Sequence, residues 1–141
     1  MYILILQGAP NSGKTCSLNK LISMLTKDKN GKYVCRKDEI RAKNSNDCTV
    51  PIIYKDKLVA ISTYGDDENS LLSFYNNYKG YADILVCPAH TEGKTAMLVE
   101  KWKQTNYVVV ENKVKTSSEK FNIANKTCAM QLFQKITDII M

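Results

Sequence analysis

The stretch Gly8-Ala9-Pro10-Asn11-Ser12-Gly13-Lys14-Thr15 decides the fold that this sequence predicts. It follows the apolar run Tyr2-Ile3-Leu4-Ile5-Leu6 and precedes residues 16–26, whose apolar positions have helical spacing. Glycines at the first and sixth positions permit bends that a Cβ would obstruct, so successive backbone N–H groups can turn onto phosphate oxygens. The N-terminus of the following helix adds unpaired amides and the positive end of its dipole. The stretch therefore predicts a phosphate-binding loop between a buried strand and a helix.

This pattern resembles the Walker A motif of the P-loop NTPase superfamily, and both flanks argue against an ordinary strand–helix turn. The resemblance implies that Lys14 reaches the β- and γ-phosphates of a nucleoside triphosphate and that the Thr15 hydroxyl ligates Mg²⁺. ATP with Mg²⁺ is the expected ligand. The residues expected to contact it are Gly8, Asn11, Ser12, Gly13, Lys14, Thr15 and Cys16. Lys14 is expected to be exposed in the loop, where it would contribute little to the core.

The length of 141 residues suits a single domain, residues 1–141, and the hydrophobic content of 44% is ordinary for a globular protein. No apolar run approaches the ~18 residues of a membrane span. The apolar run at residues 3–6 is too short for a signal peptide and lacks a basic flank, so a cytoplasmic location is expected. Five widely spaced cysteines favour free thiols, with Cys87 and Cys128 as core residues.

The net charge of +6 comes almost wholly from lysine, because Arg36 and Arg41 are the only arginines. The lysines are scattered, which favours a solvated surface over a nucleic-acid site. The expected partners are therefore a nucleoside triphosphate and either a small-molecule acceptor or a macromolecule, with no membrane partner.

Strands and helices alternate along the rest of the chain. Apolar runs predict strands at residues 2–6, 33–35, 50–54, 58–62, 82–87 and 107–110, and helical spacing predicts helices at 14–26, 69–78, 93–104 and 122–141. The apolar positions expected to face the core are Leu18, Leu21, Ile22 and Leu25 in the first helix, Leu71, Leu72 and Tyr75 in the second, Met97, Leu98 and Trp102 in the third, and Ala129, Leu132, Phe133, Ile136 and Ile140 in the fourth. Residues 50–62 form a predicted β-hairpin, with Pro51 toward the sheet edge and the second arm directly beside the first strand. The polar residues 36–47 show no period and are predicted to be a connection. The sequence thus predicts an α/β, three-layer P-loop NTPase fold with a mostly parallel sheet, one antiparallel hairpin strand and helices on both faces.

Ligands of such sheets bind beyond the carboxyl ends of the strands, which here means residues 8–15, 62–67, 88–94 and 111–115. In the family, an aspartate usually ends a strand near the loop and helps to hold the metal. Ser62 stands at that position, so Asp66 is the candidate carboxylate for metal binding and, with Lys14, for catalysis. The open alternatives are a metal held through water by Ser62 or Thr63, and a role for Asp66 and Asp67 as acids at a helix N-terminus.

The stretch Pro88-Ala89-His90-Thr91-Glu92-Gly93-Lys94-Thr95 is similar to a second loop of this kind but lacks the leading glycine. His90 is either a general base or substrate contact, or a solvent-facing loop residue. Lys94 is either a second phosphate contact or a charge near a helix N-terminus. Asn112-Lys113-Val114-Lys115 occurs where GTPases carry N-K-x-D, but Lys115 can only donate hydrogen bonds, so a guanine preference is not supported.

The leading functional prediction is a kinase-like P-loop enzyme, either an NTP hydrolase or a small-molecule phosphotransferase. Nucleoside monophosphate kinases are similar in size and loop, but they place several arginines on the acceptor, and this chain has two. The alternative is a nucleotide-dependent switch with slow hydrolysis that acts on a protein or nucleic-acid partner. In either case Arg36 or Arg41 is a candidate arginine finger.

Overall fold

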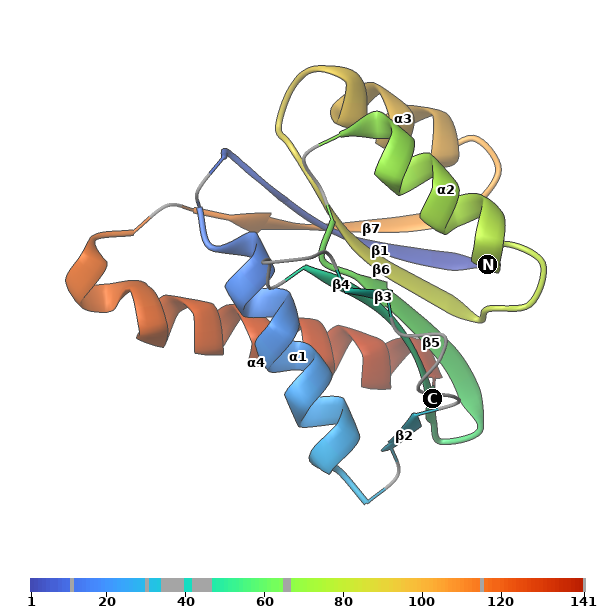
Figure 1. Ribbon diagram of the computed structural model, residues 1–141, viewed down its shortest axis with the longest axis horizontal. Coiled ribbons are helices and arrows are strands. Elements are labelled where there is room, and N and C mark those ends of the chain that lie inside the picture. Colours follow the sequence, from blue (N-terminus) through green and yellow to red (C-terminus); the bar gives the residue numbers. More distant parts are fainter. Residues whose placement is uncertain are drawn as a thin grey trace.

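The computed structural model describes residues 1–10, 12–29, 31–33, 40–41, 47–64, 67–114 and 116–140. Strands and helices alternate along them except in the described parts of residues 31–62, where strands follow one another (Figure 1). The strands are β1 (Tyr2–Gly8), β2 (Gly31–Tyr33), β3 (Ile40–Arg41), β4 (Cys48–Tyr54), β5 (Lys57–Ser62), β6 (Ile84–Ala89) and β7 (Tyr107–Lys113). The helices are α1 (Lys14–Lys27), α2 (Glu68–Tyr78), α3 (Lys94–Trp102) and α4 (Phe121–Ile140), with a short 3-10 turn at Ser118–Lys120.

The described strands form one mixed sheet in the order β2-β4-β5-β6-β1-β7, and β3 also pairs with β4. Strands β5, β6, β1 and β7 run parallel, whereas β4 is antiparallel to β5, as the predicted hairpin requires. Its turn places Lys55 and Asp56 at φ of 49° and 65°, the backbone that matches the twist of a two-residue hairpin. β4 pairs with β3 at Cys48 and Thr49 and with β2 from residue 52 onward, and Pro51, which has no N–H, falls between them.

One prediction about the order of the strands is wrong. The second arm of the hairpin, β5, does not lie beside β1, because β6 is between them. β1 pairs instead with β6 and β7, so that Leu4 has Val86 and Val109 as its neighbours. Both β5 and β6 are apolar runs, and the hydrophobic pattern alone does not say which of two such strands is adjacent to β1.

Helices cover both faces of the sheet, α1 and α4 on one and α2 and α3 on the other (Figure 1). The buried side of α1 is the predicted stripe of Leu18, Leu21, Ile22 and Leu25. On α4 the predicted residues Ala129, Leu132 and Ile136 are buried, and Phe133 and Ile140 pack partly buried against the same core. The two faces therefore have separate cores, and the predicted α/β architecture with helices on both faces is confirmed.

The buried faces of α2 and α3 differ in part from those predicted. Leu72 and Met97 are exposed, whereas Phe74 on α2 is buried. Tyr75 is partly buried, and its ring stacks on Trp102 of α3 at 4.9 Å between centroids. On α2 the buried residues Leu71, Phe74 and Tyr78 fall at i, i+3 and i+7, a helical stripe to which Leu72 does not belong.

The four described cysteines are free, and Cys48, Cys87 and Cys128 are buried. Burial raises the pKa of the Cys87 thiol. It also raises the pKa of the Cys128 thiol, although a hydrogen bond with Ser17 opposes part of this increase. The prediction of core thiols at residues 87 and 128 is confirmed. Within the described ranges no helix is both long and apolar enough to cross a bilayer.

Replacing Leu132 with alanine tests the packing of α4. The side chain is fully buried, and its loss should lower the free energy of unfolding by about 2 to 5 kcal/mol. Met130 lies on the same helix with 55% of its surface exposed, so Met130→Ala should change the stability by no more than ~0.5 kcal/mol. Urea denaturation followed by circular dichroism measures both, and equal effects would contradict the packing of α4.

Candidate functional site

The site lies where two neighbouring strands send their chains to opposite faces of the sheet. β1 leads into α1 on one face, and β6, its neighbour, leads into α3 on the other. Such a divergence opens a crevice beyond the carboxyl ends of the strands, where ligands of α/β sheets bind. Because β5, β6, β1 and β7 are parallel, the described parts of the loops after them share this edge, as predicted.

Glycine is required at both positions of the loop motif because neighbouring atoms lie where a Cβ would stand. Gly13 has φ of +95°, in the left-handed region, and a Cβ there would collide with the amide oxygen of Asn125 on α4. At Gly8 a Cβ would stand 2.7 Å from Ser12 Oγ and 2.8 Å from the carbonyl oxygen of Lys113 at the end of β7. The loop is thus in close contact with α4 and β7, and these contacts explain its two glycines independently of any ligand.

Asn125 is a site residue that the sequence analysis missed. Its side chain is fully buried, and its Oδ1 accepts a hydrogen bond of 3.3 Å from the Ser17 hydroxyl of α1. The signal was available, because residue 125 falls on the apolar stripe of Ala129, Leu132 and Ile136. A polar residue on such a stripe needs a polar partner, and the partner here is the first turns of α1.

Lys14 is buried, with 7% of its surface exposed, so the prediction that it is exposed is wrong. Its Nζ donates to the carbonyl oxygens of Gly8 at 2.9 Å and Ala9 at 2.8 Å. The side chain therefore runs back over the loop that precedes it instead of extending into solvent. Its removal affects the folded loop as well as any phosphate contact.

Asp47 places a carboxylate beside Thr15, at a position that the sequence did not indicate. Its Oδ1 accepts hydrogen bonds from the Thr15 hydroxyl at 3.3 Å and the Thr63 hydroxyl at 3.0 Å. Thr63 in turn accepts from the Cys48 N–H at 2.8 Å, which ties the start of β4 to the end of β5. Asp47 was missed because it ends the aperiodic polar segment, where no local pattern indicates a contact with Thr15.

The remaining predicted residues near β5 have different outcomes. Asn11 and Asp66 lie outside the described residues, so the predicted roles of Asp66 in metal binding and catalysis stay predictions. Ser62 is buried, and its Oγ accepts from the Tyr64 N–H at 3.2 Å. Asp67 caps α2 by accepting from the Ser70 N–H at 2.6 Å, which confirms it as an acid at a helix N-terminus.

The loop after β6 is similar to the first loop only in its turn into the helix. Gly93 has φ of +91°, and α3 begins at Lys94 as α1 begins at Lys14. The loop is one residue shorter, however, and Lys94 is exposed where Lys14 is buried. His90, the first residue of this loop, contacts Gln7 of β1 and Thr95 of α3 through its backbone.

The donor set around α1 fits a metal-bound triphosphate. Thr15 and Asp47 offer a hydroxyl and a carboxylate, the oxygen ligands that Mg²⁺ prefers, and Cys16 lies exposed in the same helical turn. The described residues contain no group of three His, Cys, Asp or Glu side chains that could enclose a metal alone. A Mg²⁺ ion held here would therefore depend on phosphate oxygens and water for its other ligands.

Comparisons with protein-family models, curated proteins and solved structures find no match to this chain.

Gly13→Ala tests the close approach of the loop to α4. The added methyl group collides with Asn125 and forces a strained φ, so the free energy of unfolding should fall by about 1 to 3 kcal/mol. Gly80→Ala is the matched control, since a Cβ there meets no atom within 4 Å. Thermal denaturation of both variants measures the difference, and a Gly13 variant as stable as the Gly80 variant would contradict the described contact.

Proposed function

We propose that this protein binds a nucleoside triphosphate as its Mg²⁺ complex and transfers or hydrolyses the terminal phosphate, as a member of the P-loop NTPase superfamily. The observation that carries the proposal is the meeting of Thr15 and Asp47 at the first turn of α1, beside the glycine loop. A hydroxyl and a carboxylate at this place have no role in the hydrophobic core, whereas both suit a phosphate-bound metal.

Each residue has a defined part in this function. The loop from Gly8 to Gly13 presents backbone amides to the β-phosphate, and Lys14 exchanges its two carbonyl acceptors for phosphate oxygens. When bound, Mg²⁺ neutralises charge that develops on the phosphates. Thr63 orients the Asp47 carboxylate toward Thr15, which keeps the two ligands in place before binding.

ATP is the proposed nucleotide. The position that would accept hydrogen bonds from guanine holds Lys115 in this sequence, and an ammonium group has no acceptor. A nucleotide-dependent switch is the second candidate. One observation favours it, because Asp47 follows the segment that joins α1 to the β4–β5 hairpin, and a metal held by Asp47 would couple that segment to nucleotide binding.

Lys14→Ala should abolish stabilisation of the protein by Mg·ATP. At about a hundred times its dissociation constant, a ligand adds about 2.7 kcal/mol to the stability of a protein that binds it only when folded. That corresponds to several degrees in the melting temperature of the unaltered protein. Because Lys14 is buried, the variant should also melt lower without nucleotide.

The measurement is therefore the shift between samples with and without Mg·ATP, taken for each variant by differential scanning fluorimetry. Lys101→Ala is the control, since it removes the same charge from an exposed site on α3. A shift of equal size in the Lys14 and Lys101 variants would overturn the phosphate-binding assignment.

Asp47→Asn should weaken the binding of Mg·ATP by about 10- to 100-fold, because the amide keeps the shape of the carboxylate but loses its charge. Binding of ATP in EDTA should not change. Asp138→Asn, on the exposed surface of α4, controls for the change in net charge. Fluorescence titration with a labelled ATP analogue measures these affinities. An Asp47 variant with unaltered magnesium dependence would favour Asp66 as the metal-binding carboxylate.

A further inference from the structure

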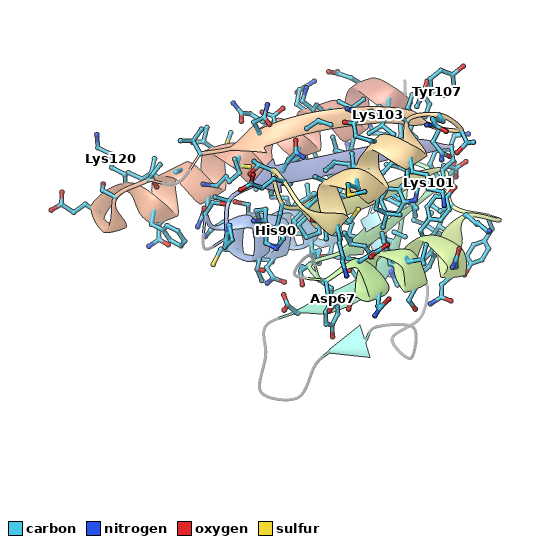
Figure 2. The ribbon with its side chains drawn as sticks, turned by 90° about the horizontal axis from the view of Figure 1, so that it is seen from above. Asp67, His90, Lys101, Lys103, Tyr107 and Lys120 are labelled. Atoms are coloured by element: carbon cyan, nitrogen blue, oxygen red, sulfur yellow. The ribbon has the colours of Figure 1, made fainter. Side chains whose placement is uncertain are left out.

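A cavity of about 380 Å³ lies at the carboxyl edge of the sheet, on the α2–α3 side. The start of α2 contributes Asp67 and Glu68 to its wall, and the loop before α3 contributes His90, Glu92 and Lys94. Its volume is near the lower end of the range for small-molecule sites, which suits a ligand with one or two rings. Figure 2 shows His90 and Asp67 away from Tyr107, which begins β7 at the opposite edge of the sheet.

The cavity and the glycine loop are neighbours by strand register. Gln7 pairs with Ala89 in the parallel ladder of β1 and β6, so the next residues, Gly8 and His90, leave adjacent strands at the same level. Neighbouring strands are about 4.8 Å apart. Gln7 and Ala89 are therefore about one strand spacing apart, and Gly8 and His90 follow them directly in the chain.

The backbone of His90 is held from two directions. Its carbonyl oxygen accepts from Gln7 Nε2 at 3.0 Å, and its N–H donates to the Thr95 hydroxyl at 3.0 Å. Thr95 is buried in the first turn of α3, so both anchors belong to regular elements. A general base needs such fixed placement near the group that it deprotonates.

The charges in the cavity wall indicate the class of ligand. Asp67, Glu68 and Glu92 are acidic, and Lys94 is the only lysine among the lining residues. A phosphorylated acceptor would meet more negative than positive charge in this wall. Hydroxyl and ammonium groups, in contrast, can donate hydrogen bonds to the carboxylates.

We propose that this cavity is the acceptor site of the phosphotransferase, that it takes an unphosphorylated, hydroxyl-bearing small molecule, and that His90 is the general base. The proposal rests on the proposed function, which supplies the nucleoside triphosphate. The acceptor hydroxyl oxygen forms a bond to the γ-phosphorus while the bond from that phosphorus to the β–γ bridging oxygen breaks. The hydroxyl proton passes to His90, and the nucleoside diphosphate leaves.

Binding of the acceptor can be tested without nucleotide, because His90 is the only histidine of the chain and its ring protons give unambiguous NMR signals. Three matched pairs serve as probes: uridine and uridine 5′-monophosphate, ribose and ribose 5-phosphate, ethanolamine and phosphoethanolamine. At least one unphosphorylated member should shift the His90 signals at millimolar concentration or below, and its phosphorylated partner should need at least tenfold more. If no unphosphorylated probe shifts the signals, or if the phosphorylated partner binds better, the proposal is overturned.

Transfer of phosphate from Mg·ATP to the same compounds tests the chemistry. His90→Ala should lower the transfer rate by about a hundredfold or more, while leaving the thermal shift with Mg·ATP unchanged. Thr91→Ala, an exposed neighbour outside the cavity wall, should stay within twofold of the unaltered protein. A His90 variant that transfers as fast as the Thr91 variant would overturn the role of His90.

The carboxylates of the cavity wall can be tested separately. Replacing Glu68 and Glu92 together with glutamine should reduce the preference for the unphosphorylated member of a pair by at least fivefold, and an unchanged preference would overturn the assignment of substrate class. If Mg·ATP gives no thermal shift with the unaltered protein, the proposed function is contradicted instead. The NMR titration would still report on the cavity in that case, so the two failures are distinguishable.

Discussion

The loop between β1 and α1 passes so close to α4 that residue 13 has no room for a side chain. The buried amide of Asn125 occupies the space where a Cβ would stand, and the same amide oxygen accepts a hydrogen bond from Ser17. The long C-terminal helix thereby fixes both the bend of the loop and the start of α1. Since α1 also positions Thr15, the geometry of the proposed phosphate site depends on packing contributed by the last elements of the chain.

The divergence of β1 and β6 gives the site two unlike halves. On the α1 side, backbone amides and Lys14 offer positive potential, with Asp47 placed where a metal ion would offset its charge. On the α2–α3 side, the wall carries more carboxylates than ammonium groups. Unlike charges on the two sides would sort an anionic donor from an uncharged acceptor, although the two sides begin at adjacent strands.

The sequence predicted the local parts of this arrangement better than the distant ones. Gly8, Gly13 and Lys14 are recognisable because the motif and both of its flanks are contiguous. Asn125 was within reach, as a polar residue on an apolar helical stripe. The role of Asp47 could not be predicted, because its contact with Thr15 joins residues 32 positions apart and its own segment has no hydrophobic period. The place of β6 beside β1 depends on which of two apolar strands the helix connections bring inward, and hydrophobic patterning alone leaves that choice open.

Lys14 stabilises the loop that precedes it through hydrogen bonds to the loop backbone. A buried ammonium group costs free energy unless hydrogen bonds compensate for its lost hydration, and the carbonyl oxygens of Gly8 and Ala9 provide such bonds. The lysine thus helps to hold the loop in its bent form. In the proposed function, a bound triphosphate would replace these neutral acceptors with anionic ones, which form stronger hydrogen bonds in a partly buried site. The loop needs little rearrangement for this exchange, because Gly13 and Asn125 already fix its curvature.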